Sequence, residues 1–170
     1  MSQTIKQKIR DYLTMIKFSH SIFALPFALS AMAMAWETVP LTMWTVFWII
    51  TAMVSARSAA MGFNRIVDAG IDAKNERTAI REIPAGILSQ TEALIFVGVS
   101  SIIFIFSSAM LSTLCLVLSV PVLAVLLGYS YTKRFTRYCH LYLGFAIGLA
   151  PIGAWVAITG TLSVSVVFLS

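Results

Sequence analysis

The sequence predicts an all-α protein, a polytopic bundle of transmembrane helices that forms one domain over residues 1–170. Its 170 residues are 59% hydrophobic and 11% charged, and the mean hydropathy is +0.89. A soluble domain is about half apolar and about a quarter charged, and a soluble fold of this length could not bury so much apolar surface. The apolar runs are too long and uniform for the strands of a membrane barrel.

Five runs are long enough to cross a bilayer, which takes about 20 apolar residues. We expect spans at 18–36, 43–63, 93–111, 112–131 and 141–160. A sixth begins near Ser163, and tight turns are expected at 84–86 and near Ser112 and Thr113. The first run also resembles a signal peptide, but the spans that follow it favour a retained helix.

The basic residues predict how the chain is oriented. Eleven of the twelve Lys and Arg residues lie before the first span, between the second and third, or between the fourth and fifth. The connections on the opposite side contain none. The positive-inside rule then places the amino terminus and both basic loops in the cytoplasm, as in a protein of a bacterial inner (plasma) membrane. Because topology explains the net charge of +5, we expect no nucleic-acid partner.

One set of oxygen-bearing side chains follows the second span. Asn64, Asp68 and Asp72 are four residues apart and share one face if the helix continues this far. Like charges at this spacing repel by about 0.2–0.5 kcal/mol, whereas a divalent cation would attract them. Hard oxygen donors suit Mg2+. The alternative is a solvated helix end whose carboxylates pair with Arg65 or Lys74.

A basic side chain inside the second span points to the same chemistry. Arg57 lies seven residues before Asn64, two helical turns away on one face. An intramembrane arginine is costly and usually faces a cavity or a partner, the alternatives being a buried ion pair or snorkelling. With Lys74, Arg77 and Arg81 beyond the carboxylates, the mixture of acids and bases suits a phosphorylated amphiphile.

A second group lies at the end of the fourth span. Tyr129 and Lys133 are four residues apart, and Arg134 follows. The two cations could contact phosphate oxygens, and the tyrosine could donate a hydrogen bond. The alternative is the ordinary tyrosine and Lys/Arg border of a cytoplasmic membrane face.

Together these motifs resemble the UbiA superfamily of intramembrane prenyltransferases, and most closely its 4-hydroxybenzoate polyprenyltransferase branch and menaquinone-pathway relatives. The resemblance runs over nearly the whole chain in the family's order. It is carried by Asn64, Asp68 and Asp72, by residues 75–86, by Tyr129 and Lys133, and by residues 143–155.

The resemblance implies a ring of nine transmembrane helices around a cavity. It also implies transfer of a polyprenyl group from polyprenyl diphosphate to an aromatic acceptor, 4-hydroxybenzoate or a related hydroxy-aromatic acid, in ubiquinone or menaquinone biosynthesis. By resemblance, Mg2+ would be held by Asn64, Asp68 and Asp72. The diphosphate would be bound by Arg57, Asn64, Tyr129, Lys133 and Arg134. The catalytic residues would be Asp68, Asp72 and Lys133.

The sequence departs from the family at a second Asp-x-x-x-Asp motif. The aspartates here are Asp11, Asp68 and Asp72 only. We therefore expect the amino-terminal portion of a family member, incomplete at its carboxy terminus, and little or no activity from these 170 residues alone. The alternatives are an inactive fragment or one subunit of a split prenyltransferase with a separately encoded carboxy-terminal half. A further alternative is a CDP-alcohol phosphotransferase, which this chain resembles in having Ala56-Arg57 before spaced aspartates. That class also needs an upstream Asp-x-x-Asp-Gly motif, which this sequence does not contain.

Overall fold

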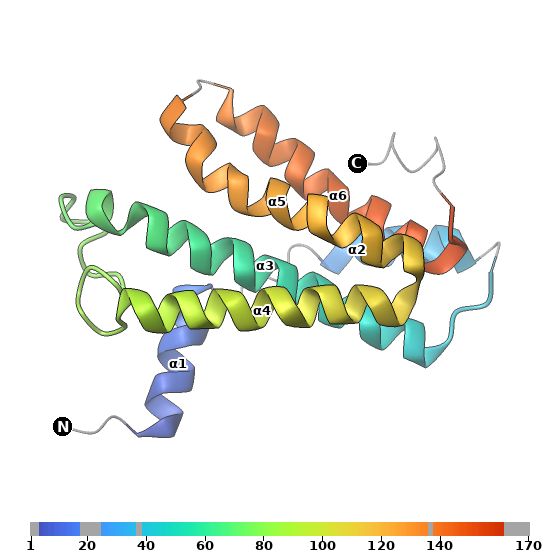
Figure 1. The fold of residues 1–170 in the computed structure, drawn as a ribbon, viewed down its shortest axis with the longest axis horizontal. Coiled ribbons are helices and arrows are strands. Elements are labelled where there is room, and N and C mark those ends of the chain that lie inside the picture. Colours follow the sequence, from blue (N-terminus) through green and yellow to red (C-terminus); the bar gives the residue numbers. More distant parts are fainter. Residues whose placement is uncertain (1–3, 18–24, 37–38, 136–137, 162–170) are drawn as a thin grey trace.

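The computed structural model describes residues 4–17, 25–36, 39–135 and 138–161, and these form helices without any strand (Figure 1). This confirms the predicted all-α class. The helices in chain order are α1 (Ile5–Met15), α2 (Leu25–Trp36), α3 (Met43–Asp72), α4 (Gln90–Leu111), α5 (Thr113–Phe135) and α6 (Cys139–Thr159).

Within the described residues, four helices are long and apolar enough to cross a membrane: α3, α4, α5 as far as Thr132, and α6. They confirm four of the five predicted spans. The predicted span at 18–36 falls partly outside the described residues, and α2 contributes 12 residues to it. The sixth span expected from Ser163 lies outside them altogether.

Helix α3 is longer than the predicted span because its helical conformation does not end with the apolar sequence. It begins at the N-cap Thr42, whose side chain accepts a hydrogen bond from the backbone N–H of Thr45 at 3.1 Å. Its 30 residues end at Asp72, so at a rise of about 1.5 Å per residue the helix is about 45 Å long. The helix therefore continues past the predicted span, through residues 64–72.

Helices α3 and α4 run side by side and pack closely (Figure 1). The two helices lie close together at Gly62, where an added Cβ would lie 2.8 Å from Cγ2 of Val97. Small residues permit such backbone approach between membrane helices. Helix α5 packs on α3 and α4, and α6 packs on α2 and α5, which completes the described bundle.

The connections next to α4 match the predicted turns. Gly86 has φ +72° in the turn before α4, a conformation that glycine adopts without strain. The Ser89 hydroxyl accepts a hydrogen bond from the Glu92 N–H at 3.1 Å, and Glu92 accepts one from the Ser89 N–H at 3.0 Å, which makes a capping box. At its other end α4 is separated from α5 by Ser112 alone, as predicted.

Candidate functional site

The first group of predicted site residues lies at the carboxy-terminal end of α3. Because the helix runs unbroken to Asp72, Asn64, Asp68 and Asp72 lie on one face, one turn apart. Asn64 and Asp68 are half-buried, while Asp72 is only 6% exposed. The condition on which the sequence argument depended, a helix that continues past residue 63, is therefore met.

The connection after α3 folds back and supplies a cation to Asp72. Nη1 of Arg81 lies 2.6 Å from Oδ2 of Asp72, in an ion pair that is also a hydrogen bond. The Thr78 hydroxyl donates to the backbone carbonyl of Asp72 at 3.0 Å. The predicted alternative named Arg65 or Lys74 as the partner of the carboxylates. For Asp72 the ion pair is with Arg81, because the turn brings Arg81 back onto the helix end.

Arg65 has a structural role that the sequence did not reveal. Its side chain is buried, and its Nε donates a hydrogen bond to the Met15 carbonyl at 3.1 Å, which joins α3 to the end of α1. It also interacts electrostatically with Asp68 and Asp72. The guanidinium thus adds positive charge close to the carboxylates while it holds two helices together.

The second group, on α5, lies against the first. The Arg134 guanidinium donates to the carbonyl of Val67, the residue before Asp68. The Tyr129 hydroxyl interacts electrostatically with Asp68. Lys133 belongs to α5, but its side chain lies outside the described residues. Two motifs that are distant in sequence therefore meet at one end of the bundle.

Aromatic rings support this junction of α3, α5 and α6. Phe63 of α3 meets Tyr131 of α5 edge-on, with ring centroids 5.8 Å apart. The ring of Tyr129 stacks on that of Tyr142 from α6, with centroids 6.4 Å apart. These contacts fix the end of α5 relative to α3, and with it the backbone that carries Tyr129 and Arg134.

Arg57 lies deeper in the bundle. It is on the same face of α3 as Asn64, about 10 Å along the helix axis at 1.5 Å per residue. The residue is half-buried, and its Nε has no hydrogen-bond partner among the described residues. Among the residues that the structure describes, no carboxylate forms an ion pair with Arg57. A half-buried guanidinium of this kind suits an anionic ligand that enters from the end of the bundle where the two motifs meet.

The donor set suits a metal that is shared with a ligand. Among the described residues, no three His, Cys, Asp or Glu side chains lie close enough to hold a metal ion. The face of α3 offers two carboxylates and the amide of Asn64. Mg2+ typically takes one or two carboxylates and completes its shell with water and substrate phosphate. The oxygens present therefore fit this mode of binding. A metal ion at Asp72 would share that carboxylate with Arg81, which is paired to it.

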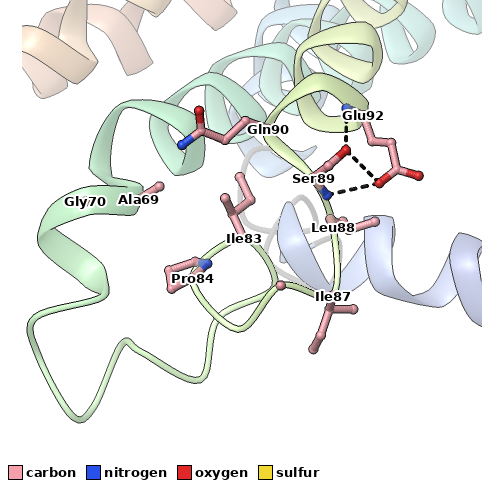
Figure 2. A pocket seen from close by; sticks show the side chains of 10 residues that line it. Ala69, Gly70, Ile83, Pro84, Ile87, Leu88, Ser89, Gln90 and Glu92 are labelled. Atoms are coloured by element: carbon pink, nitrogen blue, oxygen red, sulfur yellow. Dashed lines mark hydrogen bonds between the residues drawn. The ribbon is translucent and has the colours of Figure 1, made fainter.

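A cavity of about 470 Å3 lies beside this site, between the end of α3, the turn at 83–89 and the start of α4 (Figure 2). Ala69 and Gly70 line it from α3. They are rotated by about 100° and 200° from Asp68, since each residue turns the helix by about 100°. The cavity therefore lies away from the carboxylate face and contains none of the predicted site residues.

Comparison with known proteins identifies the family. The UbiA prenyltransferase family model matches residues 24–170. The chain belongs to this family. The resemblance inferred from the motifs is thereby confirmed, and the CDP-alcohol phosphotransferase alternative is set aside.

Several curated relatives are named as 4-hydroxybenzoate prenyltransferases. The chain is 36% identical to the 4-hydroxybenzoate octaprenyltransferase of Dechloromonas aromatica over 119 residues, which cover 69% of the chain and 40% of that relative. It is 29% identical to the mitochondrial 4-hydroxybenzoate polyprenyltransferase of Arabidopsis thaliana over 111 residues, 65% of the chain and 27% of that protein. The chain thus spans less than half the length of these relatives.

Solved structures confirm the fold. A UbiA homologue from Aeropyrum pernix K1 is 37% identical with a TM-score of 0.79, covering 88% of this chain and 55% of that one. A homologue from Archaeoglobus fulgidus, bound to GPP and Mg2+, is 13% identical with a TM-score of 0.72, covering 92% and 57%. The second similarity is one of fold alone.

Proposed function

We propose that one end of the bundle, where the motif of Asn64, Asp68 and Asp72 meets that of Tyr129, Lys133 and Arg134, binds the diphosphate of a polyprenyl diphosphate together with Mg2+. We call this the motif end. In our proposal the protein acts in transfer of the polyprenyl group to a hydroxy-aromatic acid such as 4-hydroxybenzoate, for ubiquinone or menaquinone biosynthesis. The observation that supports this best is the junction of the two motifs, where Arg134 of α5 is hydrogen-bonded to α3 beside Asp68. The names of the relatives support the acceptor class.

The charges around this junction suit the departure of a diphosphate. Asn64, Asp68 and Asp72 would hold Mg2+, which when bound neutralises charge that develops on the leaving oxygen. Arg57, Lys133 and Arg134 would neutralise the rest of the diphosphate, and Tyr129 would donate a hydrogen bond to it. We assign the catalytic roles to Asp68, Asp72 and Lys133.

The reaction needs little covalent chemistry from the protein. The allylic carbon–oxygen bond breaks and its electron pair leaves with the diphosphate, where fixed positive charge stabilises it. A ring carbon of the electron-rich acceptor then bonds to the allylic cation, and that carbon loses its proton. The protein excludes water from the cation, and a helical cavity within the bilayer is suited to this.

The test of the reaction is turnover in a protein that contains this segment. Asp68→Ala and Asp72→Ala should each lower turnover by about a hundredfold or more, the effect of removing one electrostatic contact at such a centre. Lys133→Ala should weaken use of the prenyl diphosphate more than binding of the aromatic acid. Unchanged turnover in folded aspartate variants contradicts the assignment.

We further propose that the motif end faces the cytoplasm, in the inner membrane of a bacterium. Lys74 is exposed beside the site, so Lys74→Cys reports on it after Cys115 and Cys139 are replaced by serine. An impermeant thiol reagent should not label it in intact spheroplasts but should label it after lysis. Labelling before lysis contradicts the orientation.

A further inference from the structure

We propose that α1 is an interfacial helix that docks on an anionic phospholipid surface through an apolar stripe of Ile5, Ile9 and Leu13. The inference does not depend on the proposed function. Figure 1 shows α1 running across the direction of α3 and α4, close to the end where α4 begins. Because α3 and α4 are candidate spans, a helix that crosses their direction lies along the membrane plane.

The depth of α1 follows from its contacts with α4. Nζ of Lys8 lies 2.6 Å from a carboxylate oxygen of Glu92, in the first turn of α4. The hydrogen bond and the charge of Glu92 raise the pKa of Lys8 above its usual value. The ring of Tyr12 stacks on Phe96 one turn later, with centroids 5.2 Å apart. The hydrogen bond from Arg65 then holds the carboxy-terminal end of α1.

These contacts place α1 at the level of a membrane surface. Helix α4 has 22 residues, which span about 33 Å at about 1.5 Å per residue. The hydrocarbon core of a bilayer is about 30 Å thick. Glu92, in the first turn of α4, therefore lies near one boundary of the hydrocarbon, and α1 lies beside it.

One exposed face of α1 is apolar. Ile5, Ile9 and Leu13 are one turn apart and share a face, and they are 77%, 54% and 42% exposed. Lys6 and Arg10, also one turn apart and both exposed, follow directly beside this stripe. A helix with an apolar stripe next to basic residues is typical of segments that lie in the headgroup region.

The charges favour anionic lipid as the occupant. The one acidic residue of α1, Asp11, is buried and accepts a hydrogen bond from the Gln7 side chain at 3.0 Å. The exposed surface therefore combines apolar side chains with Lys6 and Arg10 and presents no carboxylate. Lipid phosphates complement the cations, while Ile9 and its neighbours along the stripe enter the acyl boundary.

Nitroxide labels on the full chain in lipid nanodiscs test this proposal. In a background with both native cysteines replaced by serine, Ile9→Cys reports on the apolar stripe and Thr14→Cys on the exposed polar side of the same helix. In discs that contain phosphatidylglycerol, oxygen should reach the Ile9 label better than a water-soluble nickel complex does, and the Thr14 label should show the opposite preference. Equal access of nickel to both labels overturns the proposal. Exclusion of both reagents from the Ile9 label also overturns it, because protein would then cover the stripe.

Charge removal gives an independent measurement. Each basic residue near an anionic surface strengthens membrane association about fivefold, so Lys6→Gln and Arg10→Gln should each lower the ratio of immersed to water-exposed Ile9 label by about that factor. Lys74→Gln, the same charge change at an exposed position off α1, should leave the ratio unchanged. In discs of phosphatidylcholine alone, the α1 variants should match the parent. Equal effects in both kinds of disc overturn the choice of anionic lipid.

Discussion

The ion pair between Arg81 and Asp72 predicts that removing the arginine tightens metal binding. Its two atoms are 2.6 Å apart, and the Asp72 and Arg81 side chains are 9% and 30% exposed. A metal ion at Asp72 must share or displace this cation, and both positive charges act on one carboxylate. A hydrogen bond to a charged group contributes about 1.5–3 kcal/mol, and we take the lower value because Arg81 is partly solvated. About 1.4 kcal/mol is tenfold in affinity, so Arg81→Gln should lower the Kd for Mg2+ about tenfold.

The assay is titration calorimetry of Mg2+ into the purified chain in uncharged nanodiscs, without prenyl diphosphate. Omitting the substrate separates competition for Asp72 from any contact of Arg81 with phosphate. Arg77→Gln is the matched control, since it removes the same charge from an exposed position of the same connection. We expect its Kd to stay within about twofold of the parent, because exposed charges are screened by salt.

Unchanged or weaker Mg2+ binding by the Arg81 variant, with the Arg77 variant behaving as expected, refutes this reasoning. Arg81 would then be holding Asp72 in place for the metal instead of competing with it. A thermal measurement checks the same pair. In EDTA, Arg81→Gln should unfold at a lower temperature than the parent, because it leaves the buried Asp72 carboxylate without its cation. Saturating Mg2+ should restore part of the loss.

Two further predictions concern the scaffold and are measured by thermal unfolding in one detergent. Gly62→Ala should destabilise the protein by about 1–3 kcal/mol, because the new methyl group meets α4 at 2.8 Å. Gly98→Ala, whose Cβ meets nothing within 4 Å, should be neutral or stabilising; similar losses in both variants contradict the packing argument. Ser89→Ala should cost about 1 kcal/mol through loss of the N-cap, and an unchanged unfolding temperature means that the capping box with Glu92 does not contribute.

The sequence was informative wherever local pattern determines structure. Four apolar runs became helices of the expected kind, and the turn at Ser112 lies where polar residues interrupt a long apolar stretch. The spacing of Asn64, Asp68 and Asp72 correctly indicated a shared face. The shared face exists only because the helix continues past the apolar sequence to Asp72. Hydropathy alone does not predict this continuation.

Contacts made through turns and between helices were not predictable in the same way. Arg81 reaches Asp72 because the connection folds back, and no spacing rule relates residues nine apart across a turn. The bond from Arg134 to the Val67 carbonyl depends on how α5 packs against α3. Helix α1 was not predicted because its 11 residues are too few for a membrane span, although Ile5, Ile9 and Leu13 repeat every four residues, as in an amphipathic helix.

The central claim, that the carboxylate face of α3 binds a diphosphate through Mg2+, is tested most directly by equilibrium binding of radiolabelled geranyl diphosphate to the chain in nanodiscs. We expect binding with Mg2+ that weakens at least tenfold in EDTA, the order of one lost charged contact. Asp68→Asn and Asp72→Asn should lose the Mg2+-dependent part, while Glu76→Gln, the same charge change at an exposed position beyond the helix, should retain it. Binding that is equally tight in EDTA, or equally Mg2+-dependent in the aspartate variants and the Glu76 control, would contradict the account.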